Sequence, residues 1–191
     1  MKKIGLTGGI GAGKTYVSKI FQKMGIPIFN ADEQAQKCMV EDSSLKAAVQ
    51  LAFGESMYLK GVLQKDALAN IVFNNTEALG KLNALVHPIV KQKFEDWCTQ
   101  QSTSIVIKEA AILFESGAHL GLDAVVCVGA PEKLRITRVQ KRDGSSVEQI
   151  ESRMSKQMPQ AEKEELADFL IVNDQVQLLL PQVLTIITEM E

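Results

Sequence analysis

Short apolar runs alternate along the chain with segments whose apolar residues recur at helical spacing. Each run is apolar throughout, rather than alternating with polar residues, which is typical of strands buried on both faces of a parallel sheet. We therefore predict a three-layered α/β protein in which helices flank a five-stranded parallel sheet. The strands are expected at residues 4–7, 26–29, 105–107, 124–128 and 169–172.

Two longer stretches between these strands carry only helical patterns. Residues 31–103, between the second and third strands, exceed a simple crossover, so we expect an inserted helical subdomain that supplies a pocket for a second substrate. Residues 131–167 separate the last two strands and contain the helix-capping signal Ser146-x-x-Gln149. The chain should therefore consist of a sheet core that is interrupted twice by helical segments.

The composition excludes several classes of protein. Of 191 residues, 46% are apolar and 23% are charged, and the formal net charge is −2. A disordered chain would be less apolar, and a chain that binds nucleic acid through bulk charge would be more basic. Three distant cysteines and two histidines argue against a zinc cluster and a disulfide framework. Without a signal segment or an apolar run of about 20 residues, we expect a cytoplasmic protein that binds neither membranes nor nucleic acid.

Residues 8–15 read Gly-Gly-Ile-Gly-Ala-Gly-Lys-Thr and match the phosphate-loop pattern G-x-x-x-x-G-K-[ST]. In such a loop, glycines allow close approach, successive backbone N–H groups cradle phosphate oxygens, and the following helix adds its positive end. Lys14 then reaches the terminal phosphates, and Thr15 can bind Mg²⁺ through its hydroxyl. Because the pattern follows a predicted strand and opens a predicted helix, nucleotide binding is favoured over a glycine-rich turn with a solvent-facing lysine.

Two carboxylates at strand ends are candidates for chemistry beside this loop, because ligands of open parallel sheets bind at the carboxyl ends of the strands. Asp32 follows the second strand, where it could accept a hydroxyl proton or, equally well from its position, cap the next helix. Glu109 ends the third strand, where it could hold Mg²⁺ through water or fix a substrate group. For Glu109, spacing alone favours an ordinary surface acid.

Three arginines after the fourth strand, Arg135, Arg138 and Arg142, share one helical face. Clustered arginines can close over transferring phosphates and stabilise their charge. The alternative is a solvated helix face, but the position in a phosphate-loop protein favours the functional interpretation. His87, which precedes Pro88 in the helical insert, is by itself better explained as a packing or capping residue.

Four segments, spread over nearly the whole chain, together resemble the dephospho-coenzyme A (dephospho-CoA) kinase family. The phosphate loop is generic, whereas a Leu-Asn-Ala-Leu-Val-His-Pro stretch in a helical insert is specific. The segments are residues 5–14, Ala31-Asp32, residues 82–88, and Ile112-Leu113-Phe114-Glu115 together with Arg138, Arg142-Asp143 and Ala167-Asp168.

The resemblance implies transfer of the γ-phosphate of ATP to the ribose 3′-hydroxyl of dephospho-CoA, with Mg²⁺ as cofactor. It also implies a phosphate-loop kinase fold with three parts. These are a nucleotide-binding core (residues 1–30, 104–132 and 166–191), a helical coenzyme-A-binding insert (31–103) and a helical lid (133–165).

The resemblance further implies roles for individual residues. The catalytic residues would be Asp32 as the base, Lys14 and Arg138. Substrate would be bound by Asp32, His87, Glu109 and Phe114. The nucleotide would be bound by Gly9, Gly11, Ala12, Gly13, Lys14, Thr15, Tyr16, Arg142 and Asn173, with Thr15 also holding the metal.

Three positions depart from the family pattern. Asn30 stands where the family has the first aspartate of an Asp-Ala-Asp motif, so Asp32 is the expected base. Glu109 stands where an aspartate is frequent and carries its charge one methylene further out. Tyr16 takes the place of a frequent threonine, while the preceding Thr15 keeps the hydroxyl for Mg²⁺.

Two other functions are possible on the same phosphate loop. One is phosphorylation of another small molecule, such as a nucleoside monophosphate, against which the His-Pro stretch of the insert argues. The other is a GTPase switch, which usually carries Asn-Lys-x-Asp after a strand. Here Val172 is followed by Asn173-Asp174-Gln175, so that motif is missing.

Overall fold

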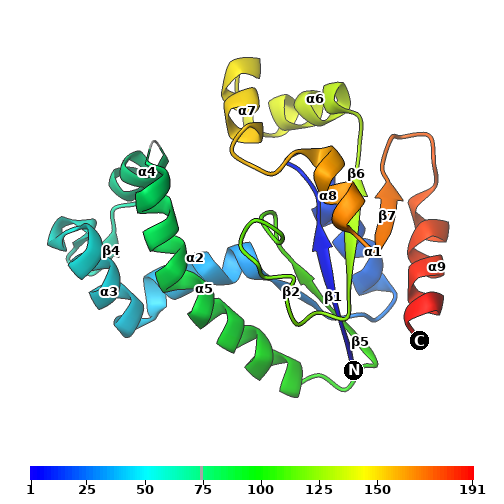
Figure 1. The fold of residues 1–191 in the computed structure, drawn as a ribbon, viewed down its shortest axis with the longest axis horizontal. Coiled ribbons are helices and arrows are strands. Elements are labelled where there is room, and N and C mark those ends of the chain that lie inside the picture. The colour runs from blue at the N-terminus through cyan, green and yellow to red at the C-terminus, as the bar shows by residue number, and fades with distance from the viewer. Residues whose placement is uncertain (74) are drawn as a thin grey trace. The chain divides into compact units, whose positions relative to one another are not determined.

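The computed structural model describes residues 1–73 and 75–191 of the chain (Figure 1). Contacts within the chain separate it into two compact units. The core unit consists of Met1–Asn30 and Gln100–Glu191, and the helical unit of Ala31–Thr99. Residues 133–165, the predicted lid, belong to the core unit by their contacts.

The core unit is built on a parallel sheet with strand order β2-β5-β1-β6-β7. All five predicted strands are present, and their ends differ from the prediction by two residues at most, so the predicted α/β fold is confirmed. Leu6 and Asn30 are both in register with Glu109, which brings the carboxyl ends of three strands together. The strands are β1 (Lys2–Thr7), β2 (Ile28–Asn30), β5 (Ile105–Glu109), β6 (Ala124–Gly129) and β7 (Phe169–Val172).

Two helices cover one face of this sheet. Helix α1 (Lys14–Lys23) and helix α9 (Leu179–Met190) contact each other, and α9 also contacts the edge strand β7 (Figure 1). Their apolar sides and the sheet enclose a buried cluster that includes Leu6, Phe21 and Val183. This packing holds the start of α1 firmly against the carboxyl end of β1, where the phosphate loop lies.

Three further helices follow β6 within the core unit: α6 (Glu132–Asp143), α7 (Val147–Met154) and α8 (Gln160–Leu166). The predicted capping box is present, because Ser146 Oγ accepts from the N–H of Gln149 at 3.3 Å and Gln149 Oε1 accepts from the N–H of Ser146 at 3.0 Å. Helices α6 and α7 contact each other, and α8 packs on β6. Throughout the described part of the chain, every helix is too short or too polar to cross a bilayer.

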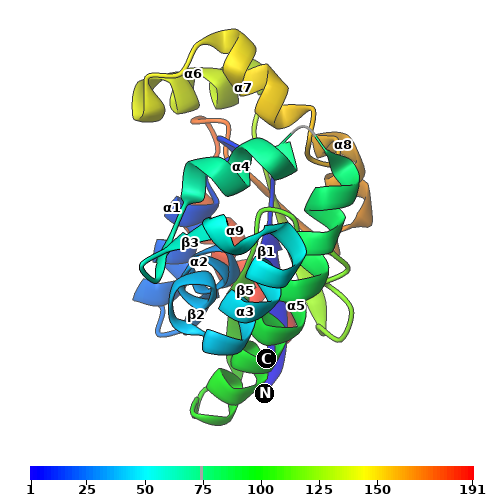
Figure 2. The ribbon, with the colours of Figure 1, turned by 90° about the vertical axis from the view of Figure 1, so that its left-hand side faces the viewer.

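The helical unit is organised around its longest helix, α5 (Thr76–Thr99). Helices α2 (Ala31–Glu41), α3 (Ser43–Phe53) and α4 (Lys65–Phe73) each contact α5 (Figure 2). The core of this unit is apolar, since Val49 of α3 and Leu68 of α4 are buried along with Phe94 of α5. Asp42 caps α3 by accepting from the N–H of Leu45 at 2.9 Å.

The prediction that the insert contains helices only is wrong. A short 3₁₀ turn (Glu55–Met57) leads into an antiparallel hairpin of β3 (Tyr58–Leu59) and β4 (Val62–Leu63). Lys60 and Gly61 form its two-residue turn with φ angles of 50° and 80°, the left-handed conformation that matches the twist of paired strands. Strands of two residues are too short to produce a periodic pattern, which is why the sequence did not reveal them.

Candidate active site

The phosphate loop leaves the end of β1 and enters α1 at Lys14. Gly13 caps the helix with a left-handed φ of 102°, and a Cβ at this position would collide with the side-chain amide of Asn173. A Cβ on Gly11 would collide with the backbone carbonyl oxygen of Arg135. These glycines therefore serve the packing of the loop against the rest of the core unit, as well as the close approach of a phosphate.

Lys14 folds back over the loop that precedes it. Its Nζ donates to the carbonyl oxygen of Gly8 at 2.8 Å, which keeps the ammonium group beside the start of α1. There the first N–H groups of the helix have no acceptor within the helix, and the helix dipole adds positive potential. Thr15 and Tyr16 follow in the first turn with exposed side chains. The arrangement is suited to binding an anion such as a nucleotide phosphate.

The carbonyl groups of the loop are held by side chains from α6 and from the end of β7. Arg138 Nη1 donates to the carbonyl oxygens of Gly11 at 3.4 Å and Ala12 at 3.3 Å. Its Nη2 donates to the carbonyl and side-chain oxygens of Asn173 at 3.0 and 3.1 Å. Asn173 in turn donates through Nδ2 to Ala12 O at 2.8 Å. Carbonyl groups tied to these donors are turned away from the side of the loop that receives phosphate.

The three arginines of α6 have different environments. Arg135 is only 5% exposed and donates through Nε to the carbonyl oxygen of Ile10 at 3.0 Å. Burial lowers the pKa of both Arg135 and Arg138 from the usual value of an arginine. Arg142 is exposed and pairs with Asp143 at 2.6 and 2.9 Å, which holds the pKa of that carboxyl far below its ordinary value. Arg135 and Arg138 are therefore not part of a solvated helix face, whereas Arg142 has an exposed side chain beside Asp143.

Glu109 is a buried carboxylate rather than the surface acid that its spacing favoured. It is 6% exposed and accepts a hydrogen bond from Ser18 Oγ at 2.6 Å. Ser18 lies one turn after Lys14 on the buried side of α1 and also bonds the Lys14 carbonyl oxygen at 3.0 Å. The available sequence signal for this contact was a small polar residue among the buried positions of the helix, and the prediction did not include it.

The segment that follows β5 contacts helix α8 and the turn before it. Phe114 is buried, and its ring centroid lies 5.1 Å from that of His119. Glu115 accepts from the N–H of Met158 at 2.9 Å and pairs with Lys163 Nζ at 2.7 Å. Lys163 is fully buried, so this ion pair anchors α8 and the turn that precedes it.

Two glutamines at the site have no recognisable sequence signal. Gln160 Oε1 accepts from the N–H of Gly9 at 2.8 Å, and Gln157 Oε1 accepts from the N–H of Ile10 at 3.0 Å. Both glutamines come from the far end of the predicted lid and lie about 150 residues from the loop in sequence. Only the folding of the chain brings these groups together.

Asp32 and His87 belong to the helical unit. Helix α2 begins at Ala31, so Asp32 lies inside its first turn, with an exposed side chain, rather than at the capping position that the sequence left open. By chain connection it comes two residues after Asn30, the last residue of β2. His87 is partly buried in α5 and precedes Pro88, which interrupts the backbone bonding of the helix.

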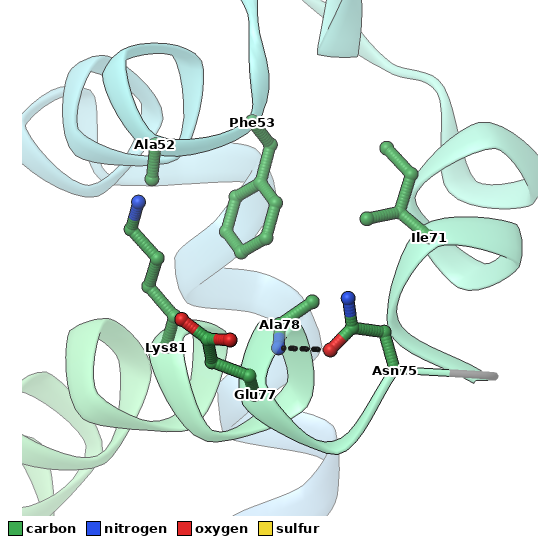
Figure 3. A pocket seen from close by; sticks show the side chains of 7 residues that line it. All are labelled: Ala52, Phe53, Ile71, Asn75, Glu77, Ala78 and Lys81. Carbon is green, nitrogen blue, oxygen red and sulfur yellow. Dashed lines mark hydrogen bonds between the residues drawn. The ribbon is translucent and has the colours of Figure 1, made fainter.

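The helical unit also contains a hollow of about 380 Å³ (Figure 3). Phe53 from α3 and Ile71 from α4 face each other across it, while Glu77 and Lys81 of α5 stand at one side. The hollow therefore has an apolar wall, with one acidic and one basic side chain at its side. The full lining consists of Ala52, Phe53, Ile71, Asn75, Glu77, Ala78 and Lys81.

No group of three histidine, cysteine or acidic side chains that could hold a metal is present in residues 1–73 and 75–191. Mg²⁺ that arrives with a nucleotide needs only one or two protein ligands, because phosphate oxygens and water supply the rest. The Thr15 hydroxyl and the buried Glu109 carboxylate, the latter bonded to Ser18 one turn further along α1, have the oxygen chemistry that such an ion prefers. The residues present therefore fit a metal that is carried by the nucleotide.

The parallel sheet, with an anion-binding loop between its central strand and α1, defines the protein as an α/β phosphate-loop protein of the class to which many kinases belong. A solved shikimate kinase from Bacteroides thetaiotaomicron has this fold, with a TM-score of 0.51 at 12% identity over 98% of this chain and 97% of that one. The structure of TT1252 from Thermus thermophilus is much more similar, with a TM-score of 0.88 at 30% identity over 98% and 96% of the two chains.

The chain belongs to the dephospho-CoA kinase family, whose model matches residues 2–178. A dephospho-CoA kinase from Bacteroides fragilis is 39% identical over 97% of this chain and 91% of its own length. One from Porphyromonas gingivalis is 38% identical over 98% and 93% of the two chains. The solved dephospho-CoA kinase from Campylobacter jejuni has a TM-score of 0.69 at 27% identity, over 99% and 97% of the two chains.

Proposed function

We propose that the protein transfers the γ-phosphate of ATP to the ribose 3′-hydroxyl of dephospho-CoA, giving coenzyme A and ADP. The observation that carries the proposal is the match with dephospho-CoA kinases over nearly the whole chain. The match includes the helical unit as well as the phosphate loop, and the helical unit is the part in which kinases of different substrates would be expected to differ. The reaction is the last step of coenzyme A biosynthesis, and we propose the cytoplasm as its location.

In this mechanism the core unit binds and orients the triphosphate. The N–H groups at the start of α1 bind phosphate oxygens, and Lys14 moves from the Gly8 carbonyl to the β- and γ-phosphates. The transition state of phosphoryl transfer is loose, so the protein acts mainly by neutralising charge on the transferring group. It forms no covalent bond with that group. Arg138 is the proposed cation from α6. Its guanidinium bonds the carbonyl oxygens of Gly11 and Ala12 in this structure, so this role requires it to turn from them toward the phosphate.

Asp32 is the proposed base that orients the 3′-hydroxyl and accepts its proton. Its support comes from the path of the chain, since β2 ends at the same edge of the sheet as β1 and β5 and Asp32 follows two residues later. Asn30, which replaces the other acid of the family motif, lies within β2, so Asp32 is the acid of that motif that this chain keeps.

Mg²⁺ is the proposed metal, held by the Thr15 hydroxyl. When bound with ATP it neutralises charge on the phosphate oxygens. Glu109 is proposed to orient the metal's water ligands or a substrate group from its buried position beside Ser18. Arg142 and Asn173 are the proposed contacts for the adenine of ATP. Of these two, Arg142 has the exposed position that a ligand needs, and Asn173 already bonds the loop.

The helical unit is the proposed binding region for dephospho-CoA. Its hollow combines the apolar surface of Phe53 and Ile71 with the ammonium group of Lys81, a combination that suits the pantetheine chain and diphosphate of this substrate. His87 on α5 and Phe114 in the core unit are the further residues proposed to contact the substrate.

The direct test measures ATP-dependent formation of coenzyme A from dephospho-CoA. ADP release is monitored by coupling it to NADH oxidation, and the product is identified by mass spectrometry. We expect turnover with dephospho-CoA and little turnover with nucleoside monophosphates or shikimate. Preferred phosphorylation of a nucleoside monophosphate would replace the proposal with the alternative substrate class. Binding of GTP in preference to ATP, without transfer, would favour the GTPase alternative.

A further inference from the structure

The phosphate loop is held by side chains that bond both its carbonyl groups and its N–H groups. Its carbonyl groups at Ile10, Gly11 and Ala12 accept from Arg135, Arg138 and Asn173. Two of its N–H groups, those of Gly9 and Ile10, instead donate to the side-chain oxygens of Gln160 and Gln157. Backbone donors of a phosphate loop are the groups that usually bind the ligand, so their use by side chains of the protein itself requires an explanation.

The orientation of the Gln160 amide follows from its other partners. Its Nε2 donates to Glu164 Oε1 at 2.7 Å and to the carbonyl oxygen of Val128 at 3.1 Å. Both partners are acceptors, so the nitrogen must face them and the oxygen must face the N–H of Gly9. Gln160 therefore links the loop to the end of β6 through a bonded network, and it is not a loosely placed surface side chain.

The segment that carries both glutamines is itself anchored to the core unit. Glu115 accepts from the N–H of Met158, between the two glutamines, and from the buried Lys163. Lys163 also donates to the carbonyl oxygen of Ala111 at 2.7 Å. Because a buried ion pair of this kind is costly to break, residues 157–163 are held in place and are poorly suited to be released whenever ATP binds.

We propose that Gln157 and Gln160 are positioning residues of the phosphate loop. By holding the N–H groups of Gly9 and Ile10, they hold the first half of the loop still. The carbonyls of residues 10–12 then stay outward, and the N–H groups at the start of α1 are ready for the triphosphate before ATP arrives. The glutamines act through the loop backbone, so their effect falls on ATP and not on the second substrate. The inference rests on the proposed use of ATP by this loop.

The test uses Gln157→Met and Gln160→Met, which keep the length of the side chain and remove its acceptor, in the full-length protein. We expect the dissociation constant of MgATP, measured by calorimetry without the second substrate, to rise about five- to tenfold in each variant, as for the loss of one hydrogen bond. The KM for dephospho-CoA should stay within twofold of wild type. Gln140→Met, at an exposed position of α6, is the matched control and should change neither constant.

Amide hydrogen exchange read by NMR supplies a measurement that a general loss of stability would not reproduce. Exchange at Ile10 should accelerate in Gln157→Met, and exchange at Gly9 should accelerate in Gln160→Met, with the α9 amides unchanged. In wild-type protein the protection of both amides should persist or increase when MgATP is added. This last measurement needs no variant, so it tests whether the glutamines stay bonded to the loop even where a variant fails to fold.

Three results would overturn the proposal. Tighter MgATP binding in the methionine variants would mean that the glutamines compete with phosphate for the loop. Unchanged MgATP binding would mean that the contacts have no role in preparing it. Loss of protection at Gly9 and Ile10 in wild type on adding MgATP would mean that the glutamines leave when the ligand binds. Failure of the proposed phosphoryl transfer is a separate result, because it is measured with dephospho-CoA, while this test needs MgATP binding alone.

Discussion

The core unit and the helical unit differ in what they bury. The buried polar and charged side chains of the described residues all belong to the core unit, whereas the buried side chains of the helical unit are apolar except for the hydroxyl group of Tyr58. Burying a polar group is costly unless it is hydrogen-bonded, and most of these groups are bonded at or near the phosphate loop. They are Thr7, Ser18, Lys108, Glu109, Arg135, Lys163 and Asn173.

This difference shows that the two units place different requirements on their buried side chains. The core unit holds a backbone loop in one conformation, which needs donors and acceptors at defined places inside the protein. The helical unit needs only a packed apolar core to support its surface, and such a core tolerates substitution as long as its volume is kept. The variants described next test this contrast, beginning with the largest expected effect.

Lys14→Ala should remove about three orders of magnitude from kcat, because the cation that neutralises the transferring phosphate is lost. The free energy of unfolding should change by less than about 1 kcal/mol. Steady-state kinetics with ATP and dephospho-CoA, together with urea denaturation, measure both quantities. Lys19→Ala, at an exposed position of the same helix, is the control and should behave as wild type. A Lys14→Ala variant with more than a tenth of wild-type turnover would contradict the mechanism.

Asp32→Ala asks whether a residue of the helical unit takes part in the chemistry. We expect kcat to fall about 10²-fold, as for loss of a general base, while the dissociation constant of MgATP stays unchanged. The adjacent Glu33→Ala is the control, since Glu33 pairs with Lys37 on the exposed side of α2. Near-normal turnover in Asp32→Ala would remove the base from the mechanism and confine the chemistry to the core unit.

Lys163→Met and Phe94→Ala compare a buried ion in the core unit with a buried ring in the helical unit. Each should lower the free energy of unfolding by about 3 kcal/mol, the first by leaving Glu115 without its cationic partner and the second by opening a cavity. Only Lys163→Met should also raise the KM for ATP, because Lys163 anchors the helix that carries Gln160. Urea unfolding and steady-state kinetics measure both. Equal effects of the two variants on the KM for ATP would contradict the contrast between the units.

Lys81→Ala tests the hollow of the helical unit as a binding region for the second substrate. The KM for dephospho-CoA should rise about fivefold, as for loss of a partly exposed contact between a cation and a phosphate, and the KM for ATP should not change. Lys81→Arg should restore most of the affinity. Lys91→Ala, on the exposed side of the same helix, is the control. An unchanged KM for dephospho-CoA would place the substrate elsewhere.

Thr7→Val tests a buried polar group that, unlike the others among the described residues, has no hydrogen bond. In the described part of the chain, Thr7 Oγ1 is the buried side-chain polar atom without a hydrogen-bond partner. Replacing an unsatisfied hydroxyl with a methyl group of the same shape should stabilise the protein by about 1 kcal/mol. Thermal unfolding measures this, with Thr137→Val, whose hydroxyl is exposed and bonds Lys133 O, as the control. A loss of stability in Thr7→Val would show that the hydroxyl is bonded in solution.

Much of this protein could be predicted from local sequence. The five strands, the capping box at Ser146 and the phosphate loop at residues 8–15 depend on neighbouring residues, whose periodicity or spacing is visible in the chain itself. The hairpin at Lys60-Gly61 was missed because two-residue strands carry no period. The burial of Glu109 was missed because its position at a strand end does not reveal that Ser18 would bond it.

The sequence by itself determined the fold class and the nature of the chemistry, because apolar periodicity specifies which elements form and the loop motif specifies a phosphate ligand. Only the tertiary structure decided which of three arginines on one helical face reach the loop and which one pairs with Asp143 in solvent. It also brought Gln157 and Gln160 to the amides of Ile10 and Gly9. The physical reason is that hydrogen bonds between residues about 150 positions apart depend on the packing of whole helices against the sheet, and a local pattern contains no record of that packing.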